Sequence, residues 1–127
     1  MTIRLTTGID VIEIDRIEHA VERWGNRFLR RIYTERELAI CRGQGQRLAG
    51  RFATKEAASK ALGVGIRTLS WRDIEVLRDP LGKPMITLHG KAATIAQAKG
   101  LNQFDVSITH SRSDAVAVVV AWGEDTP

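Results

Sequence analysis

The chain has little of what secreted and membrane-bound proteins are built from. Among its 127 residues Cys41 is the single cysteine, so no intrachain disulfide can form and a reducing cytoplasm is expected. No stretch approaches the roughly 20 apolar residues of a membrane-spanning helix, and no signal peptide is recognised at the start. Repeats and linkers are also absent, so we expect one domain over residues 1–127, in the cytoplasm and without a membrane partner.

Aromatic residues are scarce too, at 6% of the chain, and this bears on its positive charge of +4. The excess is local, because residues 16–51 hold nine arginines against four acids, whereas the remainder holds ten bases against eleven acids. A local excess of positive charge attracts a nucleic acid, a phosphorylated cofactor or an acidic protein. Alternatively, these arginines simply form a solvated basic face. Few aromatics are available there to stack on bases and no reader motif is recognised, so no nucleic-acid partner is expected.

Hydrophobic spacing predicts mostly helices in the first half of the chain. A strand at 3–12 comes first, and Thr34 with Glu37 forms a capping box that opens a later helix. Gly63 follows a run rich in Ala, Leu, Lys and Glu, as expected at the end of a long helix. The expected helices are 13–24, 27–32, about 34–41, and a long central one from about 46 to 62.

After Gly65 the period changes from helical to strand-like. The segments 73–77 and 84–88 flank turn residues and predict a hairpin, and a helix is expected between Gly90 and Gly100. Two further strands, 104–110 and 115–122, are joined by a short turn and should pair antiparallel; the last is so apolar that we expect burial on both faces. The predicted class is α+β, with N-terminal helices and one long central helix packed on a mostly antiparallel sheet.

Three charged residues stand out before any family is considered. Asp10 ends an apolar strand, where an acid is costly unless it is paired or bound to a cation. It could equally accept turn or backbone hydrogen bonds. Glu56 and Lys60 are one helical turn apart, and the simplest explanation is a surface pair worth a few tenths of a kcal/mol.

Five segments together resemble the holo-[acyl-carrier-protein] synthases, the small bacterial class of 4′-phosphopantetheinyl transferases. The similarity covers nearly the whole chain, and two departures from the family pattern, Thr7 and Thr54, touch no charged position. The matching segments are Gly8-Ile9-Asp10-Val11 with Arg16-Ile17, Leu48 to Ala57, Lys60-Ala61-Leu62-Gly63, Gly82-Lys83-Pro84, and Val106 to Ser111.

The resemblance implies a reaction and a set of residues. The 4′-phosphopantetheine arm of coenzyme A would move to a serine of acyl carrier protein in fatty acid biosynthesis, with Mg²⁺ as cofactor and adenosine 3′,5′-bisphosphate as the leaving product. Asp10 and Glu56 match the family's metal ligands; Asp10, or a water near it, is our candidate base, and Glu56 is the alternative. Lys60 would hold the departing phosphate, and Arg51 and His110 would contact coenzyme A phosphate.

The same resemblance supplies partners and an assembly. Arg16, Arg23 and Arg27, with Phe28 as an apolar anchor, would meet the acidic carrier protein. A homotrimer with active sites between subunits is implied by the family alone. Two rivals remain: a non-enzymatic nucleic-acid-binding domain, and a different magnesium-dependent phosphoryl enzyme, such as a nuclease, that uses Asp10 and Glu56.

Overall fold

A computed structural model describes residues 2–125 and confirms the α+β class. Each predicted helix and strand is present, with ends that differ by a few residues. In chain order the elements are β1 (Thr2–Glu13), α1 (Ile14–Trp24), α2 (Asn26–Ile32), α3 (Glu35–Cys41), α4 (Gly45–Leu62), two 3₁₀ turns (Ile66–Thr68 and Trp71–Asp73), β2 (Ile74–Arg78), β3 (Pro84–Leu88), α5 (Gly90–Ala98), β4 (Gln103–His110) and β5 (Asp114–Asp125).

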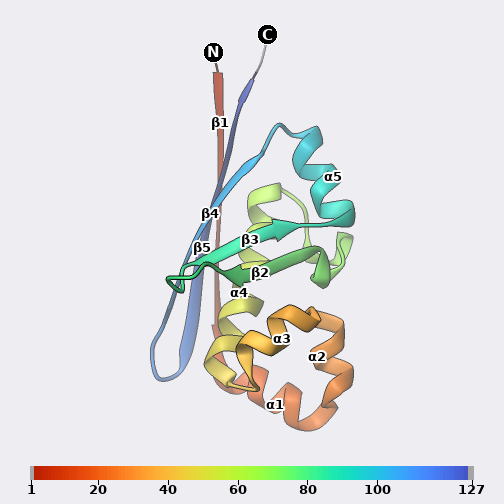
Figure 1. Ribbon diagram of the computed structural model, residues 1–127, viewed down its shortest axis with the longest axis vertical. Helices are drawn as coiled ribbons and strands as arrows, with labels where there is room; N and C mark the ends of the chain where they lie inside the picture. The colour runs from red at the N-terminus through yellow and green to blue at the C-terminus, as the bar shows by residue number, and fades with distance from the viewer. Residues whose placement is uncertain (1, 126–127) are drawn as a thin grey trace.

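Two antiparallel sheets organise the molecule. β5 is the central strand of the larger sheet, with β1 on one side and β4 on the other, and the hairpin β2–β3 forms the smaller sheet. Figure 1 shows the large sheet along the long axis, with α1, α2 and α3 gathered at one end and both chain ends at the other. Helix α4 contacts the large sheet and β2, so it lies between the two sheets.

Small residues let α4 lie directly on the large sheet. A Cβ atom on Gly8 would collide with the backbone of Ala57, and one on Gly50 would come within 3.0 Å of Ile108. Ala57 itself is fully buried, as are most residues of α4. This close packing brings one turn of α4 beside the middle of β1 and another beside β4.

A buried ion pair joins α4 to the smaller sheet. Lys55 and Glu37 are both 0% exposed, and Lys55 Nζ donates to Glu37 Oε1 at 2.9 Å. Lys55 also donates to the carbonyls of Trp71 and Ile74. Glu37 accepts from the Val76 N–H at 2.9 Å, in addition to its part in the predicted capping box at the start of α3. Burial lowers the pKa of Lys55, and the Glu37 carboxylate opposes that shift.

The expectation that the last strand is buried on both faces is wrong for the single chain. Side chains of β5 alternate between a buried face against α4 and an outer face on which Val118 is 37% exposed. Ile9 and Val11 on β1 continue this outer face and are each 60% exposed. The sequence pattern could not distinguish a core strand from a strand with one uncovered apolar face. Within residues 2–125, no helix combines the length and the apolar character that crossing a bilayer requires.

Candidate active site

The structure brings Asp10, Glu56 and Lys60 together where α4 crosses β1. Lys60 Nζ donates to the Ile9 carbonyl at 2.9 Å and to Asp10 Oδ1 at 3.3 Å. The Lys60 side chain is 53% exposed and that of Asp10 is 18% exposed. A simple surface pair of Glu56 and Lys60 therefore does not describe this cluster. Asp10, which lies on β1, is its third member.

Asp10 also acts on Glu56. Partial burial raises the pKa of Glu56, the negative charge of Asp10 raises it further, and Lys60 opposes both. A carboxyl group with a raised pKa accepts a proton more readily near neutral pH. The cluster thus holds two neighbouring carboxylates and one ammonium group at a partly open surface.

The donor set suits a hard divalent cation shared with a substrate. No group of three or more His, Cys, Asp or Glu side chains that could hold a metal occurs among residues 2–125. Two carboxylates are nevertheless what Mg²⁺ commonly takes from a protein, with phosphate oxygens and waters completing its shell. The charge of Asp10 is near enough to raise the pKa of Glu56, and a cation between the two carboxylates would offset their like charges.

Arg51 and His110 meet in a different place. With Gln44, Arg47, Gly50 and Ile108 among its other walls, they line a pocket of about 340 Å³ beside the start of α4. Arg51 is 8% exposed and donates to the carbonyls of Val76 (3.0 Å) and Arg47 (3.4 Å), so part of its guanidinium already serves the fold. His110 is exposed and closes the pocket from the end of β4.

In one chain this pocket is separate from the carboxylate cluster. Asp10 and Ile108 flank Ala117 in the sheet, and His110 lies two residues further along β4. Two strand spacings and two residues of rise put the Cα atoms of Asp10 and His110 roughly 12 Å apart. Arg51 and Glu56 point about 140° apart around α4, since successive helical residues turn by about 100°.

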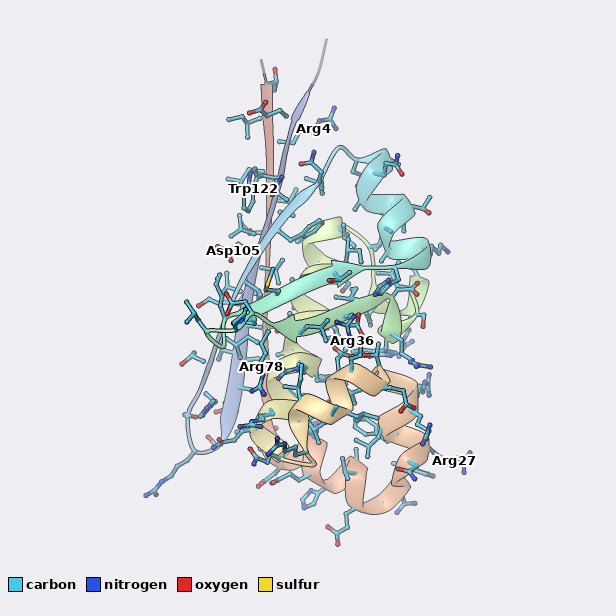
Figure 2. All side chains as sticks on the ribbon, viewed as in Figure 1. Arg4, Arg27, Arg36, Arg78, Asp105 and Trp122 are labelled. Carbon is cyan, nitrogen blue, oxygen red and sulfur yellow. The ribbon has the colours of Figure 1, made fainter. Side chains whose placement is uncertain are left out.

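The proposed carrier-binding residues form a basic surface at the helical end of the molecule. Arg23 and Arg27 place their guanidinium carbons 5.0 Å and 6.0 Å from the Trp24 ring centroid. Trp24 and Arg27, with Phe28 and Arg31, line a pocket of about 360 Å³, and Figure 2 shows Arg27 pointing outward there. Arg16 is exposed on the same helix, α1, as Arg23.

Trp24 is a residue of this surface that the sequence analysis did not single out. Half of its surface is exposed, and it lines the same pocket as Arg27 and Phe28. The available signal was its position beside Arg23 and three residues before Arg27, which suits two cation–π contacts on one exposed ring.

Comparison with known proteins now identifies the family. The family described as the 4′-phosphopantetheinyl transferase superfamily matches residues 6–119. The chain belongs to the 4′-phosphopantetheinyl transferase superfamily. This chain is 50% identical over 126 residues to a holo-[acyl-carrier-protein] synthase of Herpetosiphon aurantiacus. The aligned part covers 94% of this chain and 99% of that relative.

Solved structures of the superfamily agree with the fold. The Helicobacter pylori holo-[acyl-carrier-protein] synthase in complex with coenzyme A is 39% identical, with a TM-score of 0.83 over 91% of this chain and 98% of that one. The Bacillus anthracis synthase in complex with coenzyme A (3′,5′-ADP) is 36% identical, with a TM-score of 0.78 over 97% and 100% of the two chains. These matches confirm the family and fold that the motifs predicted, whereas the roles of individual residues stay predictions.

Proposed function

We propose that this superfamily member transfers the 4′-phosphopantetheine arm of coenzyme A to a serine of apo-acyl carrier protein, in fatty acid biosynthesis. Adenosine 3′,5′-bisphosphate is the second product. The observation that carries the proposal is the cluster of Asp10, Glu56 and Lys60, in a chain 39% identical to a synthase solved with coenzyme A. Its place in the cytoplasm stays a prediction.

The cluster can perform each part of this phosphoryl transfer. The serine oxygen forms a bond to the phosphorus that carries the arm, and the bond from that phosphorus to the oxygen of the bisphosphate breaks. The serine proton passes to a carboxylate, for which Asp10 and Glu56 are the two candidates. Lys60 holds the oxygen that leaves. Asp10 and Glu56 would hold Mg²⁺, which when bound offsets the negative charge of the pyrophosphate.

The remaining coenzyme contacts fit an active site between subunits of a homotrimer. Arg51 and His110 line a pocket apart from Asp10 in the single chain, and we propose that both residues reach the phosphate from a neighbouring copy. The uncovered apolar face, with Ile9, Val11 and Val118, is a surface on which copies would pack. A monomer in light scattering would contradict this assembly.

Intact-mass spectrometry of apo-acyl carrier protein tests the transfer. The carrier is incubated with this protein, coenzyme A and Mg²⁺, and we expect a gain of one phosphopantetheine. The gain should vanish with EDTA and with Glu56→Gln, but persist with Glu124→Gln, a matched change at an exposed site. Cleavage of nucleic acid without transfer to any apo-carrier would favour the nuclease instead.

Charge reversal tests the carrier surface separately. Arg16→Glu or Arg23→Glu should raise the KM for carrier protein about tenfold, since such charges steer association, and leave the KM for coenzyme A unchanged. Arg67→Glu, at an exposed site outside this surface, is the charge-matched control. Equal changes in both KM values would remove the assignment.

A further inference from the structure

Trp24 stands at the corner between the first two helices. It is the last residue of α1, and half of its surface is exposed. Gly25 follows with φ at +54°, a backbone conformation that favours glycine, and turns the chain into α2. The Gly25 N–H donates to the Val21 carbonyl at 2.8 Å, and the Phe28 N–H donates to the Gly25 carbonyl at 3.1 Å. The indole ring is therefore presented to solvent on a corner whose backbone is hydrogen-bonded on both sides.

Two arginines from different helices lie against this one ring. Arg23 of α1 and Arg27 of α2 place their guanidinium carbons 5.0 Å and 6.0 Å from its centroid. Both distances are within the roughly 6 Å over which an indole ring attracts a cation. A guanidinium that rests on a ring uses its face, so the N–H donors in its plane stay available to carboxylates. Trp24 thus restrains two positive groups at once.

No carboxylate of residues 2–125 forms an ion pair with either arginine. Arg30, close by on α2, is instead paired with Glu35 at 3.0 Å. Arg23 and Arg27 are exposed, so their charge is available to an acidic partner. Within the described chain, the ring of Trp24 is what restrains these two side chains.

Restraint of this kind favours binding. An exposed arginine moves among many rotamers and loses that freedom when a partner binds it. A guanidinium that already rests on a ring loses less, so a carboxylate binds it more tightly. Arg16 lies eight residues before Trp24 on α1, about 12 Å along the helix axis, and is too far away to share this restraint.

The ring belongs to the basic surface described above. Trp24 and Arg27 line its pocket of about 360 Å³ together with Phe28 and Arg31. The Phe28 ring meets the ring of the buried Tyr33 edge to face, with centroids 6.2 Å apart. Figure 2 shows Arg27 pointing outward at this end of the molecule. Positive charge and restrained donors together fit the carboxylates of an acidic carrier protein.

We propose that Trp24 is a positioning residue for carrier binding, and that its ring holds Arg23 and Arg27 in place for the carboxylates of the carrier. This inference rests on the proposed function. Trp24 acts through the two arginines and has no part in the chemistry at Asp10 and Glu56, so its loss affects carrier binding alone.

Two substitutions separate the aromatic ring from its apolar bulk. Trp24→Leu keeps an apolar side chain but removes the ring, whereas Trp24→Phe keeps a smaller one. In steady-state transfer, Trp24→Leu should raise the KM for carrier protein about fivefold and leave kcat and the KM for coenzyme A unchanged. Trp24→Phe should restore most of this loss. Met85→Ala, at an apolar site of similar exposure (52%) on β3, should change neither KM.

A double-mutant cycle tests whether the ring acts through the arginines. Arg23→Gln alone should raise the KM for carrier protein about fourfold, but less than about twofold in the Trp24→Leu background. Arg16→Gln should have the same effect in both backgrounds, because sites this far apart contribute independently. Equal effects of Arg23→Gln in both backgrounds would overturn the positioning role, since Trp24 would then act on the carrier without Arg23.

Each remaining outcome has a consequence. Because Trp24 is half exposed, the melting temperature of both Trp24 variants should match that of the wild type. An unchanged KM for carrier protein in Trp24→Leu, or equal rises in both KM values, would overturn the inference. Calorimetry of apo-carrier binding repeats the cycle without turnover. If the wild-type protein binds the carrier but transfers nothing, the proposed function fails, and the calorimetric cycle still decides the role of Trp24. Absence of carrier binding would overturn both.

Discussion

Two lysines of helix α4, five residues apart, each pair with a carboxylate from another element. One pair is buried and the other is partly exposed. Lys55 and Glu37 lie 2.9 Å apart with no exposed surface. Lys60 and Asp10 lie 3.3 Å apart, with 53% and 18% of their side chains exposed. The first pair is closed off between α3, α4 and β2, and the second opens at the edge of β1.

The two pairs differ most in how completely their charges are satisfied. Lys55 has three hydrogen-bond acceptors, and Glu37 accepts from Lys55 and from two backbone N–H groups. Asp10 instead has a second carboxylate, Glu56, as a neighbour. Complete satisfaction stabilises a fold, whereas leftover negative charge at an open surface is available to a cation or a substrate. The contrast therefore assigns the closed pair to stability and the open pair to chemistry.

The largest expected effect comes from breaking the closed pair. Glu37→Ala leaves the Lys55 ammonium buried without its counter-charge and also removes the capping box. Loss of one partner of a buried ion pair costs about 3–5 kcal/mol, and we expect the free energy of unfolding to fall by that amount. Urea denaturation followed by circular dichroism measures it.

The matched variant is Lys60→Met in the open pair. Exposed pairs contribute about 0–1 kcal/mol, so its midpoint should lie close to that of the wild type. If Glu37→Ala and Lys60→Met lowered the free energy of unfolding by similar amounts, both pairs would contribute alike to stability. The assignment of the closed pair to stability and the open pair to chemistry would then be wrong.

The next largest effect is a slower transfer reaction when Glu56 of the open cluster is changed. Removal of a general base typically lowers a rate about 10²–10⁴-fold, so Glu56→Gln should slow transfer to the carrier by such a factor while the protein remains folded. Single-turnover mass spectrometry with saturating coenzyme A measures the chemical step. A Glu56→Gln enzyme with the wild-type rate would exclude Glu56 as the base.

A smaller loss is expected at Lys60. Lys60→Ala removes one charged contact to the leaving oxygen, and we expect turnover about 10²-fold lower, because one such donor contributes that much in other acyl and phosphoryl enzymes. Full turnover in Lys60→Ala would remove its assigned role, and Lys91→Ala, at an exposed site on α5, controls for the loss of positive charge.

The sequence could predict what depends on local pattern. The capping box of Thr34 and Glu37 needed only their spacing, and the predicted helices and strands needed only periodicity. The second role of Glu37, as the partner of Lys55, was invisible because it joins residues 18 positions apart through tertiary packing. The contact between Asp10 and Lys60 joins residues 50 positions apart, and no local pattern predicts it. The family resemblance anticipated only that Asp10 and Glu56 would act together as metal ligands.

The wrong expectation for β5 has the same origin. Its apolar run predicted burial on both faces, but hydrophobicity does not say which covering layer belongs to the same chain. The bond from Arg51 to the Val76 carbonyl was not predicted either, because it depends on where β2 lies, which no local pattern specifies. Whether Arg51 also binds phosphate stays a prediction.

The smallest expected effect is on how stability changes with pH, through the carboxyl group of Glu56 in the open cluster. Because burial and Asp10 raise the pKa of Glu56, the folded chain binds this proton more tightly than the unfolded chain does. The contribution of Glu56 to stability is therefore most favourable below its ordinary pKa of about 4.3 and declines as the pH rises through its raised value. Glu56→Gln stays neutral throughout, so thermal melting should show a variant more stable than the wild type at pH 7 and a smaller difference at pH 4. Glu124→Gln, at an exposed site, is the matched control for the loss of one carboxylate. A Glu56→Gln protein less stable than the wild type at pH 7 would mean that the open cluster is satisfied after all, and the contrast with Lys55 and Glu37 would be lost.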